Sequence, residues 1–171
     1  MHAFLLRHPI PLVILFIIAT WLLSNINNKI TSETQIRPVQ FFSVEKFATP
    51  KPINPVHFNQ VLDKLTNKID KSVFHRFFYI DFCWALLLLC NIYVFTCRLK
   101  GTQTPIRWLI AILSLAYCFD VLENLSYLTA SPRLVQHLEY TNQAKLLFYA
   151  LGVGSLLYAI IYRGTQKLKI N

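Results

Sequence analysis

Four ionisable residues lie inside long apolar runs of the sequence, where charged side chains are rare. Asp81, Asp120 and Glu123 are acidic, and Lys145 is the one basic residue placed inside such a run, apart from the flanking Arg107 at the start of the third. Burying an ionisable group at membrane depth costs free energy, so a functional or tightly paired role is the default expectation. These residues are therefore the first place where we expect a site.

The two acidic residues of the third run share a helix face with an amide and two tyrosines. Asp120, Glu123 and Asn124 are spaced i, i+3 and i+4, which places them on one side of a helix. Tyr117 and Tyr127 extend this stripe by a turn in either direction. A face of this polarity is expected to point into a helical bundle and away from lipid.

Depth estimates place the ionisable residues of three runs near the same membrane face. At a rise of about 1.5 Å per residue, Asp81, Glu123 and Lys145 each lie about 9 to 10 Å from the middle of their run. Successive membrane helices alternate in direction, and the three offsets then agree whichever way the chain is oriented. Tyr149 is one turn from Lys145, and we expect both to face the carboxylates.

The charges of this group do not balance. Three carboxylates against one ammonium leave two surplus negative charges if every group ionises. In surroundings of low dielectric constant, either a carboxyl keeps its proton or another cation enters. His75 and Arg76, just before the second run, are the local candidates, followed by a metal ion, sodium or a substrate amine. Alternatively, the polar residues form only a hydrogen-bonded clamp that fixes the register of the helices.

Familiar catalytic and cofactor motifs are missing from the sequence. It contains no H-E-x-x-H zinc motif, no G-x-S-x-G and no P-loop. Cys83, Cys90 and Cys97 repeat every seven residues, and Cys118 lies in the third run. Buried thiols commonly serve as small apolar side chains, which is our interpretation here, although a metal or redox stripe is the alternative. We predict no cofactor and no metal site.

Four long apolar runs must position the ionisable residues. A bilayer core of about 30 Å takes about 20 residues of helix, and the runs cover approximately residues 9–25, 77–97, 105–129 and 142–162. Backbone amides find no water at that depth, so the runs must be helical. The 171 residues are 54% hydrophobic, too apolar for a soluble domain. The sequence predicts an all-α, integral membrane four-helix bundle that forms a single domain.

Residues 28–76 form the one sizeable predicted extramembrane loop. Four of the eight prolines lie in its first half, which has no helical period and should be irregular. In the second half, apolar residues recur at helical spacing: Val61, Leu62, Leu65, Ile69 and Val73. This pattern predicts an amphipathic helix that lies at the membrane interface and runs into the second span. The alternative is a helix that docks on the loop as a lid.

The positive charges orient the chain. Short basic flanks fall on one side of the four-span arrangement, at Arg7, Arg98, Lys100, Arg107, Arg163, Lys167 and Lys169. Because short basic loops stay in the cytoplasm, we predict a multi-pass membrane protein with both termini cytoplasmic. The first run could be a secretory signal peptide, but no A-x-A-like cleavage site follows it, so we interpret it as a retained anchor.

Residues 58–150 carry a resemblance to known proteins. An amphipathic segment leads into a span with an early aspartate (YIDF, Asp81), then comes DVLEN at residues 120–124, and then Lys145 early in the last span. This pattern resembles an uncharacterised family of small four-helix bacterial membrane proteins. The sequence departs from that family at DFCWAL, where a proline is expected soon after the aspartate, and at FHRFF, where Gly-Arg is expected. The resemblance implies a location in a bacterial inner (plasma) membrane. It also implies that these polar residues act as one unit, without supplying an activity.

Three function classes fit this sequence. The first is the binding or handling of a lipid or small amphiphile in a polar pocket near the outer face, with the carboxylates meeting a cationic or hydroxyl head group. The second is a membrane enzyme in which a carboxyl that keeps its proton acts as general acid or base. The third is a structural or assembly subunit whose polar cluster only clamps the helices. The predicted partners are membrane lipids and either a protein partner or a second copy of the chain. The net charge of +9 orients a membrane protein, so no nucleic acid is expected.

Overall fold

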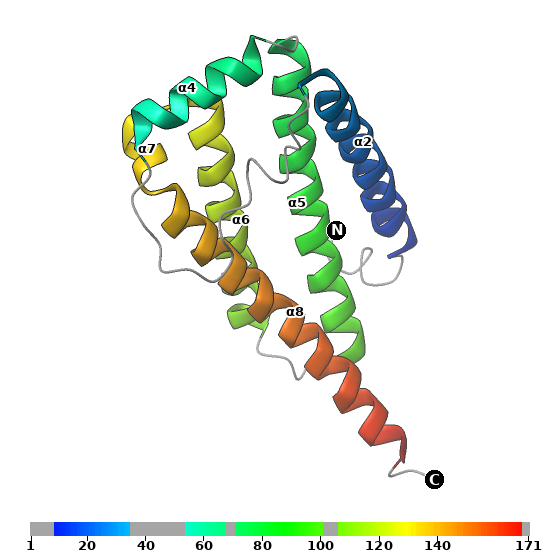
Figure 1. The fold of residues 1–171 in the computed structure, drawn as a ribbon. Helices are drawn as coiled ribbons and strands as arrows, with labels where there is room; N and C mark the ends of the chain where they lie inside the picture. Colours follow the sequence, from blue (N-terminus) through cyan, green and yellow to red (C-terminus); the bar gives the residue numbers. More distant parts are fainter. Residues whose placement is uncertain (1–8, 35–53, 68–70, 101–105, 169–171) are drawn as a thin grey trace.

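The computed structural model describes residues 9–34, 54–67, 71–100 and 106–168, and every element in this part of the chain is an α-helix. Two short helices cross one end of a bundle of four long ones (Figure 1). The long helices are α2 (Ile10–Thr34), α5 (Lys71–Lys100), α6 (Ile106–Thr129) and α8 (Leu138–Leu168). The short helices are α4 (Pro55–Thr66) and α7 (Pro132–Gln136). The predicted all-α, four-helix architecture is confirmed.

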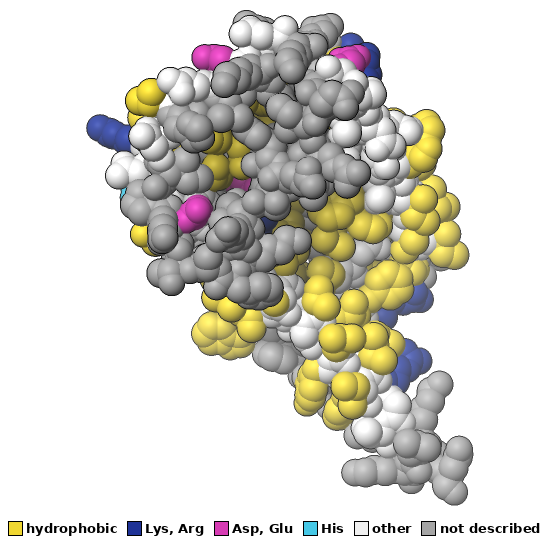
Figure 2. All heavy atoms as spheres, viewed as in Figure 1, with side chains coloured by type: hydrophobic (Ala, Val, Ile, Leu, Met, Phe, Trp, Pro, Cys, Tyr) yellow, Lys and Arg dark blue, Asp and Glu magenta, His cyan; other side chains and the backbone are white. Residues whose placement is uncertain are grey.

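All four long helices are long and apolar enough to cross a membrane. Their candidate spans are Ile10–Glu33, Ser72–Leu99, Arg107–Thr129 and Leu138–Thr165. Hydrophobic side chains cover the outer faces of α2 and α8 (Figure 2), and large ones such as Ile17 and Ile161 are well exposed. An apolar exterior of this kind suits a lipid environment, because water would penalise it.

The helices extend beyond the predicted spans. The first ends at Thr34 instead of residue 25, α5 begins at Lys71 instead of residue 77, and α8 begins at Leu138 instead of residue 142. Hydropathy marks the apolar part of a helix, whereas backbone hydrogen bonding continues into polar residues. The extension of α2 is held by packing, because Ile30 is only 1% exposed in an apolar core.

The amphipathic helix of the loop is shorter than the pattern predicts. Helix α4 ends at Thr66, a turn follows at Asn67, and α5 begins at Lys71, so Val73 belongs to the membrane helix. Asn54 begins α4 by accepting a hydrogen bond from the backbone of Val56 at 3.0 Å, with Pro55 in the first helical position. The predicted irregular half of the loop lies mostly at residues 35–53, outside the described residues.

Helix α4 docks on the end of the bundle instead of lying apart from it. It buries Phe58 and Leu62, one turn apart, in an apolar core with Phe78, Tyr127 and Val135. The rings of Phe58 and Phe78 lie 5.4 and 5.7 Å from that of Tyr127. Aromatic packing of this kind closes the bundle at the end formed by α4 and α7.

A second apolar core lies toward the other end of the bundle. It contains Leu89 and Ile92 of α5 with Leu109, Leu113 and Ala116 of α6. The predicted polar residues fall between the two cores along each of α5, α6 and α8. The bundle therefore consists of an apolar layer, a polar layer and a second apolar layer.

Candidate functional site

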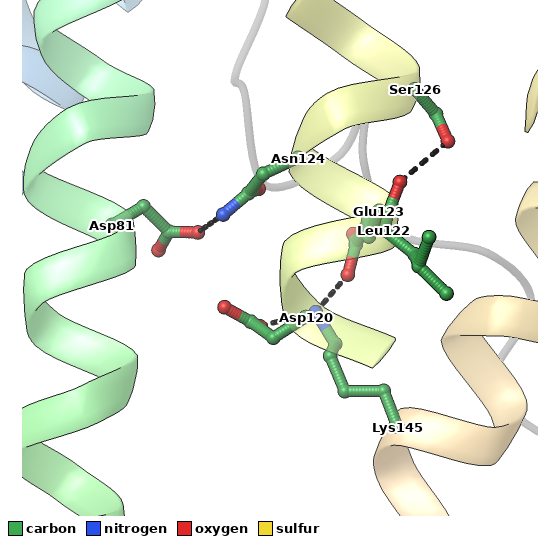
Figure 3. Close-up of polar contacts among 7 residues, drawn as sticks. All are labelled: Asp81, Asp120, Leu122, Glu123, Asn124, Ser126 and Lys145. Atoms are coloured by element: carbon green, nitrogen blue, oxygen red, sulfur yellow. Dashed lines mark hydrogen bonds and ion pairs between the residues drawn. The ribbon is translucent and has the colours of Figure 1, made fainter. Parts of the chain in front are cut away.

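Two acidic residues of α6 bind the lysine of α8. Lys145 forms an ion pair with Glu123, and its Nζ lies 3.2 Å from Oδ1 of Asp120 (Figure 3). The i, i+3 spacing of Asp120 and Glu123 places both carboxylates on the face of α6 that packs against α8. Asp120 is 4% exposed and Glu123 is 6% exposed, so both acids are buried.

The aspartate of α5 joins this group through an amide. Asn124 of α6 donates a hydrogen bond from Nδ2 to Oδ2 of Asp81, at 2.8 Å (Figure 3). Asn124 lies one turn beyond Asp120 and is also buried. The five predicted residues therefore meet across α5, α6 and α8, and we call them and Asn142, described next, the polar layer.

Asn142 is a member of the polar layer that sequence reasoning missed. In the orientation that satisfies its amide, its nitrogen donates to both carboxylate oxygens of Glu123, at 2.7 and 2.9 Å. The available signal was its position three residues before Lys145, on the same face of α8. Asn142 stands at the predicted boundary of the fourth span.

The two predicted charge partners do not reach the polar layer. His75 and Arg76 are exposed on α5, and in the described part of the chain neither forms an ion pair with the carboxylates. At 100° per residue, they point roughly 120° and 140° away from Asp81 around the helix. The surplus of carboxylates over cations predicted from the sequence is thus not offset by either residue.

Two buried polar atoms of this region have no hydrogen-bond partner among the described groups. They are Oδ2 of Asp120 and the hydroxyl of Tyr149, which lies one turn along α8 from Lys145. An unsatisfied buried polar atom costs about 1 to 3 kcal/mol and calls for an explanation. Packing of the helices alone gives no reason for leaving both atoms unpaired.

The other two predicted tyrosines have different surroundings. Tyr127 is 3% exposed and packs among aromatic rings in the core beneath α4, so its ring belongs to the apolar layer. Tyr117 is half-buried, packs on the opposite core and lines a cavity between α5 and α6. Of these two tyrosines, Tyr117 is therefore the one that borders the cavity.

This cavity measures about 410 Å³, and its wall reaches Tyr117, one turn of α6 before Asp120 of the polar layer. Its walls are mainly apolar and come from α5 and α6: Leu86, Leu89, Cys90, Tyr93, Val94, Ile110, Leu113, Ser114, Tyr117 and Cys118. Leu86 and Ile110 are each 47% exposed; Leu86 lies in the middle of its candidate span, and Ile110 lies about one turn inside the end of its own. The cavity is therefore open sideways, on the surface that suits lipid. Its volume lies in the range typical of small-molecule pockets.

Within the described residues, no group of three or more His, Cys, Asp or Glu side chains is arranged to hold a metal ion. The four cysteines are free thiols, and Cys90 and Cys118 line the cavity wall.

In comparisons with known proteins, no family model, no curated protein and no solved structure matched the chain. The resemblance to a family of small membrane proteins therefore stays a prediction. Its coarser content, a chain with four apolar helices, agrees with the structure.

Proposed function

We propose that this chain binds a lipid or small amphiphile, with the alkyl part in the cavity between α5 and α6 and the head group at the polar layer. One observation carries the proposal: a sideways-open apolar cavity ends beside buried, incompletely paired charged groups. An amphiphile has this same division into apolar and polar parts. The alkyl part of the proposed ligand therefore matches the apolar cavity, and its head group matches the polar layer.

The dimensions support a single alkyl chain. The cavity wall runs from Leu86 to Val94 on α5, which is about 12 Å along a helix. On α6 the wall includes Tyr117, which lies one turn before Asp120. A molecule lying along this wall would place its end at the carboxylates.

A purely structural clamp accounts for less of the geometry. It explains why Asn124 pairs with Asp81 and why Lys145 pairs with two acids, since polar side chains do join membrane helices. It does not explain the unpaired oxygen of Asp120, the unpaired hydroxyl of Tyr149 or the adjoining cavity. A ligand accounts for all three.

The distribution of basic residues supports an orientation within the proposal. Arg98, Arg107 and Arg163 lie near the ends of α5, α6 and α8 that are remote from α4 and α7. The positive-inside rule places this basic end in the cytoplasm. In a bacterial inner membrane the polar layer would then lie nearer the outer face, with both termini cytoplasmic.

Co-purification tests the proposal. We expect chain extracted in a mild detergent to retain a near-equimolar amount of a single-chain amphiphile, measured by mass spectrometry of the organic extract. Ser114→Trp places a large ring in the cavity and should reduce the retained amphiphile at least roughly tenfold, because the ring occupies its volume.

Leu115→Trp is the matched control, since Leu115 is its exposed neighbour on α6 and lies outside the cavity wall. This variant should retain as much amphiphile as the unmodified chain. Equal retention by both tryptophan variants, or a well-folded chain recovered without any amphiphile, would contradict the proposal.

A further inference from the structure

Asp120 of the polar layer keeps one buried carboxylate oxygen without a partner among the described groups. It uses Oδ1 for Lys145, while its Oδ2 is unpaired. Asp81 uses Oδ2 for Asn124. Figure 3 shows the unpaired oxygen of Asp120 directed toward α5, the helix that carries Asp81. A buried acceptor of α6 and the carboxylate of α5 thus border the space between these two helices.

Positive charge is distributed unevenly over the polar layer. In the described part of the chain, Glu123 receives both the ammonium of Lys145 and the amide of Asn142. The same ammonium also pairs with Oδ1 of Asp120, while Asp81 receives a neutral amide. The space between Asp81 and Asp120 is therefore electronegative, because it holds two carboxylates against one ammonium that is shared with Glu123.

An ammonium group fits this space better than other head groups. It carries a positive charge and three N–H donors and has no acceptor, so it can satisfy both carboxylates through charge-assisted bonds. Tyr149, whose buried hydroxyl is unpaired, lies on α8 one turn from Lys145, the lysine that pairs with Asp120. Its oxygen would accept the third N–H. A hydroxyl head group has one donor and no charge, and a phosphate or carboxylate would be repelled.

We propose that the head group bound by this chain is a primary ammonium, held between Asp81 and Asp120 with Tyr149 as a third acceptor. This inference rests on the proposed function and names the class of its ligand. The alkyl chain of such an amine would run from the aspartates past Tyr117 into the cavity. A single-chain primary amine is thus the predicted ligand.

Binding of paired amphiphiles tests this assignment. The chain is placed in nanodiscs of neutral phosphatidylcholine, and the binding of radiolabelled dodecylamine, dodecanol and dodecyltrimethylammonium is measured after subtraction of empty nanodiscs. We expect dodecylamine to bind at least roughly tenfold more tightly than dodecanol, because only the amine carries the charge. The trimethyl compound should also be weaker than the primary amine, because it has no N–H donor.

Substitution of Asp81 locates the head group. Asp81→Asn removes one carboxylate and leaves the pairing of Lys145 with Asp120 and Glu123 in place. It should abolish the preference for the amine, so that dodecylamine binds no more tightly than dodecanol. Glu33→Gln, which removes an exposed carboxylate of α2, is the matched control and should keep the preference.

The outcomes separate this inference from the proposed function. Equal affinities for amine and alcohol would overturn the ammonium assignment and leave an amphiphile site in place. A preference that persists in Asp81→Asn would overturn the position of the head group, and equal binding of the trimethyl compound would overturn the requirement for a primary amine. Binding of none of the three compounds would overturn both proposals.

Discussion

Replacing Lys145 with methionine is expected to destabilise the bundle by about 3 to 5 kcal/mol, because it leaves buried carboxylates without their cation. Lys145 contacts both Asp120 and Glu123, and these two acids are almost fully buried. Methionine has a similar length and an apolar end, so the packing of the alkyl chain is largely kept. The free energy of unfolding, measured by titration with a denaturing detergent in mixed micelles, reports the loss.

A second lysine supplies the control for this variant. Lys29 pairs with Glu33 at 3.9 Å on the exposed surface of α2, so Lys29→Met should cost less than about 1 kcal/mol. Adding Glu123→Gln to Lys145→Met should recover part of the loss, since one uncompensated carboxylate is removed. If the two lysine variants lost the same free energy, the buried ion pairs would not be holding α6 and α8 together.

Replacing Gly152 with leucine is expected to cost about 1 to 3 kcal/mol, because it overpacks the contact between α6 and α8. A Cβ atom at Gly152 would lie 2.8 Å from Cδ2 of Leu113 and 3.8 Å from Cγ2 of Ile92. Small residues allow membrane helices to approach closely. Leu113 also forms part of the cavity wall, so displacing it should reduce amphiphile binding as well as stability.

Gly154, which lies two residues further along α8, is the matched control. No atom lies within 4 Å of a Cβ built at Gly154, so Gly154→Leu meets open space. The higher helix propensity of leucine should stabilise that variant by up to about 1 kcal/mol. Unfolding titrations of both variants give the comparison. Equal stabilities would show that α6 and α8 do not pack closely at this point.

Local spacing made most of the polar layer predictable. The i, i+3, i+4 pattern fixes a shared face for Asp120, Glu123 and Asn124 once the run is helical, whatever the rest of the chain does. The estimated depths of Asp81 and Lys145 along their spans also agree, because helices of similar length cross the same membrane. These inferences need only helix geometry and the bilayer thickness.

The cavity could not be predicted in this way, because it depends on how side chains of two helices pack. Cys90, Ser114 and Cys118 line it, and their small side chains leave space where leucine or phenylalanine would fill it. Small residues at these positions of α5 and α6 were the available signal. We interpreted the cysteines as ordinary core residues, which gave no indication of a void.

Helix boundaries were the least predictable part of the fold. The periodicity from Val61 to Val73 indicated one amphipathic helix, but the chain turns at Asn67 and starts α5 at Lys71. Two successive helices with a similar apolar period cannot be told from one continuous helix by spacing alone. The docking of Phe58 and Leu62 on the bundle end depends on tertiary contacts that the local sequence does not specify.

Photolabelling tests the central claim, that an amphiphile lies between α5 and α6, most directly. A single-chain amphiphile with a diazirine at the end of its alkyl chain is bound to the purified chain, irradiated, and mapped by peptide mass spectrometry. The proposed site predicts labels on the cavity walls, at residues 86–94 and 110–118, that an excess of unlabelled amphiphile removes. Labels spread over the outer faces of α2 and α8, and unaffected by competitor, would contradict it.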